Sequence, residues 1–203
     1  MAPRHILRNN KFFRCKEGAT GRVFYLAGAL FFIFCVYYMT RPVLLVEGDG
    51  SLVGNASQLR LTDQWNEGSR QSQTKILFTV TAEAGLQFST RFIHSVQKTP
   101  VEEYFIVNED CSGFILKSTR YQSFGVGLPF LESDGTFRRE GDSFIMDNLN
   151  RPIKILELRP GVGTELSITI NGQNLRLYEL VPIGSLVRVL IVPRWILCYR
   201  HFH

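Results

Sequence analysis

The chain has 203 residues, of which 45% are hydrophobic and 20% are charged, so its composition excludes a disordered protein and suits one ordinary domain with an added segment. Its formal net charge of +5 is concentrated near the N-terminus, in Arg4, Arg8, Lys11, Arg14, Lys16 and Arg22. A nucleic-acid-binding protein needs such charge on one face of a folded domain, so we expect no nucleic-acid partner.

The first predicted element is a transmembrane helix at residues 23–40. The segment from Val23 to Met39 holds no charged residue and no proline, and a helix of that length spans about 25 Å. This apolar run is longer than that of a cleaved signal peptide, and no small-x-small cleavage site follows it. We therefore expect an uncleaved signal anchor, with a cleaved signal peptide as the alternative.

The charges on the two sides of this helix predict its orientation. Six basic residues precede it and only Arg41 follows closely, which predicts a cytosolic basic tail at 1–22 and a single-pass type II topology. We expect a membrane of the secretory pathway, in the ER or Golgi, or the cell surface. The sequon at Asn55 then lies on the lumenal side, so Asn55 is a candidate glycosylation site.

Two cysteines, Cys111 and Cys198, fall in the predicted lumenal part. They can pair with each other, link to another chain or remain free, and the sequence leaves a dimer open. Near the end of the chain, the apolar stretch from Leu186 to Cys198 is interrupted by Arg188 and Pro193. Charges in a bilayer are costly, so this stretch is predicted as a strand, a break and a second strand.

Residues 41–74 include a polar segment rich in Gly and Ser and are predicted to form a stem or linker. Beyond it, apolar residues alternate with polar ones, which predicts short strands at 75–82, 86–90, 104–107, 153–158 and 187–192. The strongest signal is residues 165–178, where two alternating runs flank Asn171-Gly172, a pair typical of a type I′ hairpin turn. These signals predict an all-β fold, a β-sandwich at 75–197 followed by a tail at 198–203.

The order of these strands from Lys75 to Trp195 resembles a galectin carbohydrate-recognition domain. Leu86 to Phe92 is similar to the His-x-Asn-Pro-Arg-Phe strand of that family, and Ile106 to Asn108 is similar to its Val-x-Asn strand. The Asn-Gly hairpin and the last apolar strand match the end of the domain. The resemblance implies a jelly-roll β-sandwich that binds sugar on a concave sheet face.

The resemblance also implies a set of carbohydrate-binding residues. Three of them match the family's positions: Arg91, Asn108 and Arg120. Three more stand where the family carries His, Asn and Glu, namely Gln87, Ser89 and Ser118. The family's stacking Trp is replaced by Ile115, so we expect the specificity for β-galactosides to be altered or lost. Glycans or glycoproteins, some containing galactose, are the expected partners.

The residues give no argument for an enzyme, a metal or a cofactor. Glu102 and Glu103 are adjacent and therefore point to opposite faces of a strand, unlike paired catalytic carboxylates. The phenylalanines are expected in the core, in particular Phe88, Phe105 and Phe114. The predicted function is a membrane-anchored, lumenal or extracellular, non-catalytic lectin module of the galectin type. The alternative is a protein-interaction or structural ectodomain on the same scaffold without sugar binding.

Overall fold

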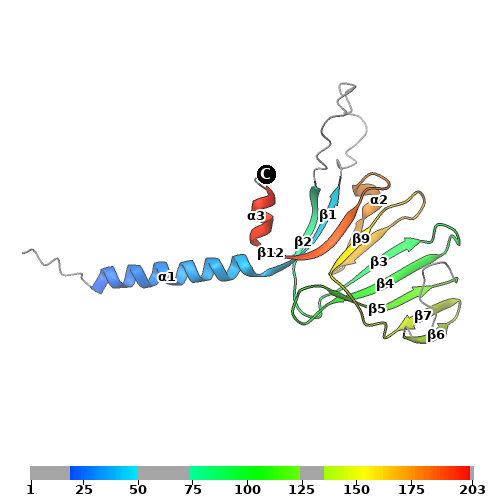
Figure 1. The fold of residues 1–203 in the computed structure, drawn as a ribbon, viewed down its shortest axis with the longest axis horizontal. Helices are drawn as coiled ribbons and strands as arrows, with labels where there is room; N and C mark the ends of the chain where they lie inside the picture. The colour runs from blue at the N-terminus through cyan, green and yellow to red at the C-terminus, as the bar shows by residue number, and fades with distance from the viewer. Residues whose placement is uncertain (1–18, 50–73, 124–134, 202–203) are drawn as a thin grey trace, which may run out of the picture. The chain divides into compact units, whose positions relative to one another are not determined.

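The computed structural model describes residues 19–49, 74–123 and 135–201, which are the coloured parts of Figure 1. The chain divides into two compact units, Met1–Met39 and Thr40–His203, and each is described by itself. Asn55 and most of the predicted stem lie outside the described residues.

The helix α1 (Ala19–Thr40) has 22 residues and includes the predicted helical segment 23–40. The consecutive side chains of Leu30 to Phe34 are between 61% and 69% exposed. Consecutive helical residues point to different sides, so the apolar surface runs around the helix. Within the described residues, however, no helix meets the length and hydropathy required of a membrane span, so the predicted transmembrane helix is not supported there.

The second unit is an antiparallel β-sandwich, which confirms the predicted all-β class (Figure 1). The strands of the smaller sheet are β1 (Pro42–Asp49), β2 (Thr74–Thr81), β9 (Ile155–Leu158) and β12 (Val187–Pro193). Those of the larger sheet are β3 (Gln87–Ile93), β4 (Pro100–Val107), β5 (Phe114–Tyr121), β6 (Thr136–Glu140), β7 (Ser143–Asp147), β8 (Arg151–Ile153), β10 (Ser167–Ile170) and β11 (Gln173–Arg176). The described sheets have the orders β2-β1-β12-β9 and β11-β10-β3-β4-β5-β7-β6, and β8 pairs with β5.

The hydrophobic core lies between the two sheets. Leu44 and Val189 contribute to it from the smaller sheet, and three phenylalanines contribute from the larger one. Phe88 stacks on Phe105 with 4.9 Å between ring centroids and meets Phe114 edge-on at 5.0 Å. The three predicted core phenylalanines are thus confirmed as buried.

Several predicted elements are found in the structure. The strand at 75–82 is β2, and the hairpin at 165–178 contains β10 and β11. Asn171 and Gly172 have φ angles of +48° and +77°, the left-handed geometry that a type I′ turn requires at both positions. The predicted strand 153–158 is broken at Lys154, where the chain passes from β8 in the larger sheet to β9 in the smaller one.

Two segments differ from the prediction. The predicted stem begins instead with β1, a central strand between β2 and β12 whose residues 43–48 are all buried. The predicted strand after Pro193 is a short helix, α3 (Trp195–His201), and another short helix, α2 (Leu177–Leu180), follows β11. Pro193 has no amide hydrogen for the sheet, and the chain turns from strand to helix just after it.

The described cysteines, Cys35, Cys111 and Cys198, are free. The disulfide between Cys111 and Cys198, one of three alternatives from the sequence, is therefore not formed. The Cys111 thiol donates a weak hydrogen bond to the carbonyl oxygen of Ala82, with 3.8 Å between sulfur and oxygen.

Candidate functional site

The candidate site is the outer face of the larger sheet, meaning the side of that sheet that points away from the smaller sheet. On β4, alternation directs Phe105 and Glu103 inward and Glu102 and Tyr104 outward. Glu102 and Glu103 therefore lie on opposite faces of the strand, as predicted.

Two rows of side chains cross the outer face at right angles to the strands. Residues directly opposite one another in an antiparallel pair lie on the same side of the sheet, so the register defines both rows. The first row contains Arg176, Ser167, Arg91, Glu102 and Arg120. The second row contains Asn174, Thr169, Ser89, Tyr104 and Ser118.

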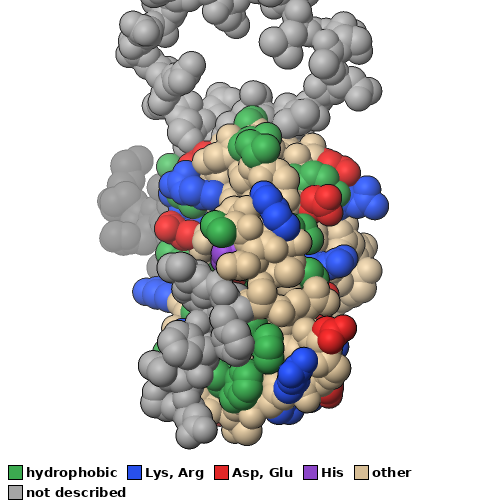
Figure 2. Space-filling view, turned by 90° about the vertical axis from the view of Figure 1, so that its right-hand side faces the viewer, with side chains coloured by type: hydrophobic (Ala, Val, Ile, Leu, Met, Phe, Trp, Pro, Cys, Tyr) green, Lys and Arg blue, Asp and Glu red, His purple; other side chains and the backbone are tan. Residues whose placement is uncertain are grey.

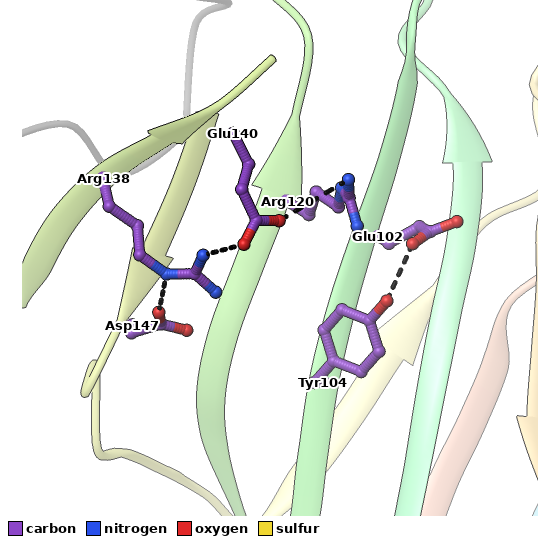
Figure 3. A network of polar contacts seen from close by, with 6 residues as sticks. All are labelled: Glu102, Tyr104, Arg120, Arg138, Glu140 and Asp147. Atoms are coloured by element: carbon purple, nitrogen blue, oxygen red, sulfur yellow. Dashed lines mark hydrogen bonds and ion pairs between the residues drawn. The ribbon is translucent and has the colours of Figure 1, made fainter. Parts of the chain in front are cut away.

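Glu102 links the two rows at the middle of the outer face. One of its carboxylate oxygens accepts a hydrogen bond of 2.8 Å from the Tyr104 hydroxyl, as Figure 3 shows. The other oxygen lies 3.5 Å from Nε of Arg91. The carboxylate thus holds an aromatic ring on its own strand and a guanidinium on the neighbouring strand.

A second chain of ion pairs continues toward the β6 edge (Figure 3). Arg120 lies 3.9 Å from Glu140, which also pairs with Arg138. Nε of Arg138 donates a 2.6 Å hydrogen bond to Asp147. The hydrogen bonds to Asp147 and Glu140 raise the pKa of the Arg138 guanidinium, which therefore remains a fixed positive charge.

Tyr104 is the aromatic residue at the centre of this arrangement. Its side chain is 40% exposed, although the strand around it is mostly apolar. Partial burial and, to a smaller extent, the hydrogen bond to Glu102 raise the pKa of its hydroxyl, so Tyr104 stays a neutral hydrogen-bond donor. Tyr104 is not among the site residues predicted from the sequence. Glu102 is the sequence signal for it: residues two apart in a strand share a face, so Tyr104 is expected on the same polar side as Glu102.

An open pocket of about 340 Å³ lies at the β11 end of the same face. Its lining is Arg91, Phe92, Ile93, Glu165, Ser167, Asn174, Arg176 and Tyr178. Arg91 belongs both to the pocket and to the pair with Glu102, so the pocket continues the first row. Its volume is at the lower end of the range of about 300–1,000 Å³ typical of small-molecule sites.

Charges of both signs alternate over this surface. In the described network Arg91 and Arg120 are each next to a carboxylate, and Arg176 lies 3.2 Å from Glu179. Figure 2 likewise shows basic and acidic side chains interspersed on the side of the protein that it draws. Such a surface does not concentrate the field of one sign that attracts a polyanion.

The structure brings together five of the six sugar-binding candidates from the sequence. Ser89 and Arg91 on β3 face outward beside Ser118 and Arg120 on β5, with β4 between them. Gln87 is also on β3, one alternation further along, opposite Ile106.

The sixth candidate, Asn108, lies apart from the outer face in the loop between β4 and β5. Its side-chain oxygen accepts hydrogen bonds from the backbone nitrogens of Ser112 at 2.9 Å and Gly113 at 3.1 Å. Cys111 has a φ of +53°, a turn conformation that these bonds stabilise. In this structure Asn108 holds a turn.

The described residues contain no group of three or more His, Cys, Asp or Glu that could hold a metal ion. What the outer face offers is a set of hydrogen-bond donors and acceptors around one aromatic ring. That chemistry suits recognition of a polar ligand.

In comparisons with known proteins, part of the chain matches a family other than the one predicted. Residues 88–177, from β3 to the start of α2, match a family described as a domain of unknown function (DUF1850). No curated protein and no solved structure matches the chain.

The galectin resemblance proposed from the sequence is therefore wrong, because the family that matches is DUF1850, which is distinct from the galectins. The motifs behind the resemblance were short alternating strands and one hairpin turn. Such features recur in β-sandwiches of many kinds, because they reflect the physics of a half-exposed sheet. Asn108, a main element of the resemblance, is a turn residue here.

Proposed function

We propose that the chain is a membrane-anchored, non-catalytic module that binds carbohydrate on the outer face of the larger sheet. The observation that carries the proposal is the exposed ring of Tyr104, fixed by its hydrogen bond to Glu102 and placed between Ser89 and Ser118.

A sugar ring has an apolar C–H surface on each side and hydroxyl groups around its rim. An exposed aromatic ring packs against the C–H surface and excludes water, with stacking worth about 0.5–1.5 kcal/mol beyond the buried area. Carboxylates accept hydrogen bonds from hydroxyls, and guanidiniums donate to them. Tyr104, Glu102 and Arg120 supply one group of each kind on neighbouring strands.

The charge pattern supports an uncharged, polyhydroxylated ligand over a polyanion. Each outer-face arginine of the central strands lies beside a carboxylate, so its charge is largely balanced before a ligand arrives. Balanced pairs still present directional hydrogen-bonding groups, and their fixed orientation lowers the entropy cost of binding. The adjoining pocket gives room for a second sugar unit beside Arg91.

The membrane part of the proposal rests on the composition and surface of α1. At about 1.5 Å per residue its 22 residues extend about 33 Å, close to the thickness of a bilayer's hydrocarbon core. No charged residue occurs from Phe24 to Thr40, and the bulky side chains there are exposed. The basic residues before α1 support a cytosolic N-terminus, with the β-sandwich in the lumen or outside the cell.

A glycan array tests the binding proposal, using the full chain in lipid nanodiscs. We expect Tyr104→Ala to weaken binding about tenfold or more, equivalent to about 1.4 kcal/mol. Tyr104→Phe retains the ring and should bind better than the alanine variant. Phe137→Ala is the matched control, because Phe137 is 39% exposed on the same sheet but belongs to an aromatic pair with Phe144.

Two results would contradict carbohydrate binding. One is an array without any bound glycan although circular dichroism shows a folded chain. The other is a glycan that binds the Tyr104→Ala variant as tightly as the unmodified chain.

A protein-interaction module is the second candidate, and one observation favours it. Val162 and Ile183 are 79% and 62% exposed at the tips of two loops. The backbone nitrogen of Gly184 donates to the Pro160 carbonyl at 2.8 Å, which ties the two loops together. A photo-crosslinking residue at Val162 that captures one defined protein in cells, with Tyr104→Ala still able to form the same adduct, would favour this candidate.

A further inference from the structure

The C-terminal helix α3 presents two large aromatic side chains to the surroundings. Trp195 is 51% exposed and Tyr199 is 61% exposed. They are four residues apart and so lie on the same side of the helix. Ile196 and Leu197, between them, are half-buried. Trp195 and Tyr199 thus form a small exposed aromatic surface on one side of α3.

The pairing of β1 with β12 determines where α3 begins. Pro42, the first residue of β1, is opposite Pro193, the last residue of β12. The backbone nitrogen of Arg194 donates a 3.0 Å hydrogen bond to the carbonyl of Arg41. Arg41 is also the residue that follows α1 in the sequence. Trp195, the first residue of α3, therefore directly follows a residue that is bonded to the backbone of Arg41.

We propose that α3 lies in the headgroup layer of the membrane that holds α1, with Trp195 and Tyr199 as interfacial anchors. This inference rests on the membrane part of the proposed function. If α1 crosses the bilayer, Arg41 lies at its surface, and the hydrogen bond from Arg194 keeps Trp195 within reach of the same lipid headgroups.

The chemistry of the segment fits that layer. Trp and Tyr combine an apolar ring with one hydrogen-bond donor, and both are enriched where hydrocarbon meets headgroups. The sequence from Trp195 to His201 contains no acidic residue, and Arg194, whose backbone is bonded to Arg41, directly precedes it. Positive charge beside the membrane is attracted to anionic lipids. At about 1.5 Å per residue a helix of 7 residues is about 10 Å long, short enough to lie flat in the interface.

Tryptophan fluorescence with brominated lipids tests the proposal directly. The chain has two tryptophans, so Trp65→Phe leaves Trp195 as the single reporter in the full chain. The variant is reconstituted into phosphatidylcholine vesicles containing 20% phosphatidylserine. We expect its emission to be blue-shifted and strongly quenched by bromine near the headgroup end of the acyl chain, and much less by bromine near the chain terminus. The Trp195→Phe variant, which retains Trp65, gives the matched background.

Carbonate extraction of the same vesicles separates this inference from its premise. A chain that stays in the carbonate pellet while Trp195 emission is insensitive to every brominated lipid overturns the position of α3 and leaves the anchor intact. A blue-shifted but unquenched emission also overturns it, because the indole is then covered by protein. Release of the chain into the supernatant overturns the anchor and this inference together.

Discussion

The inner and outer faces of the larger sheet are made by the same strands, yet their side chains differ completely in character. On β4 the inward residues Val101, Phe105 and Val107 are at most 1% exposed. The outward residues Glu102 and Tyr104 are partly exposed and bonded to each other. Because alternation separates the two faces residue by residue, one strand can stabilise the fold and present a ligand site at the same time.

The comparison teaches where stability and binding can be changed independently. Burial of an aromatic side chain contributes several kcal/mol, whereas an exposed ion pair such as Arg91–Glu102 contributes about 0–1 kcal/mol. The outer face is therefore free to vary in chemistry, while the inner face is restricted to residues that pack.

The largest effect on stability is expected at Phe105 on β4, and its neighbour Tyr104 gives the comparison. Phe105→Ala should lower the free energy of unfolding by about 3–5 kcal/mol, because it removes the buried ring that stacks on Phe88 and leaves a cavity. Tyr104→Ala should lower it by less than about 1 kcal/mol. Denaturant unfolding of the full chain in detergent micelles measures both. Equal losses for the two variants would mean that the faces do not differ in the way described.

A smaller effect is expected at Glu103, the acidic residue on the inner face. It is half-buried, and its carboxyl accepts a 3.0 Å hydrogen bond from Thr90. Desolvation by burial raises the pKa of Glu103 above its ordinary value of 4.5, and the hydrogen bond from Thr90 opposes this only in part. The folded state thus holds the proton more tightly than the unfolded state.

This raised pKa gives a definite sign to the pH dependence. The contribution of Glu103 to stability is complete below pH 4.5 and is lost as the pH rises through the folded-state pKa. We expect Glu103→Gln to flatten the stability profile above pH 4.5 and to be the more stable chain at neutral pH. Unfolding curves measured at a series of pH values test this, and parallel profiles for the two chains would contradict it.

Thr119 is a second buried polar residue whose replacement should stabilise the chain. It is fully buried opposite Glu103, and its hydroxyl oxygen has no hydrogen-bond partner among the described residues. Thr119→Val removes the buried hydroxyl at nearly constant volume, so the free energy of unfolding should rise by about 1 kcal/mol. Thr119→Ser, which keeps the hydroxyl and loses the methyl group, is the matched control and should destabilise the chain.

The smallest effect on stability is expected from Arg120, on the outer face. Its pair with Glu140 is exposed and 3.9 Å long, so Arg120→Ala should change the free energy of unfolding by less than about 1 kcal/mol. If the outer face binds glycans, the same variant should weaken binding measurably in a titration by calorimetry. A large loss of stability without loss of binding would mean that Arg120 stabilises the fold and does not bind the ligand.

The sequence allowed strands to be predicted wherever one face is buried and the other is exposed. The β2 segment and the Asn171-Gly172 hairpin are of this kind. In contrast, β1 is buried on both sides, so Val43 to Val46 are uniformly apolar and carry no alternation. It also follows an apolar helix directly, and a local pattern does not tell that strand from the start of a linker.

The candidate site was predictable only in part, for a related reason. The outward positions of Ser89, Arg91 and Arg120 follow from alternation within their own strands. The role of Tyr104 depends on Glu102 beside it and on the neighbours across β3 and β5, and that register depends on a bulge between Tyr104 and Phe105. A single sequence gives no local sign of such a bulge.

The position of β1 has a mechanical consequence. It is hydrogen-bonded along one side to β2 and along the other to β12, with seven residue pairs to each. A force pulling on the N-terminal end of β1 acts along the strand, so it loads the bonds on both sides in shear, together rather than one after another. The strand through which the domain would be tethered is thus held in a geometry suited to resisting tension.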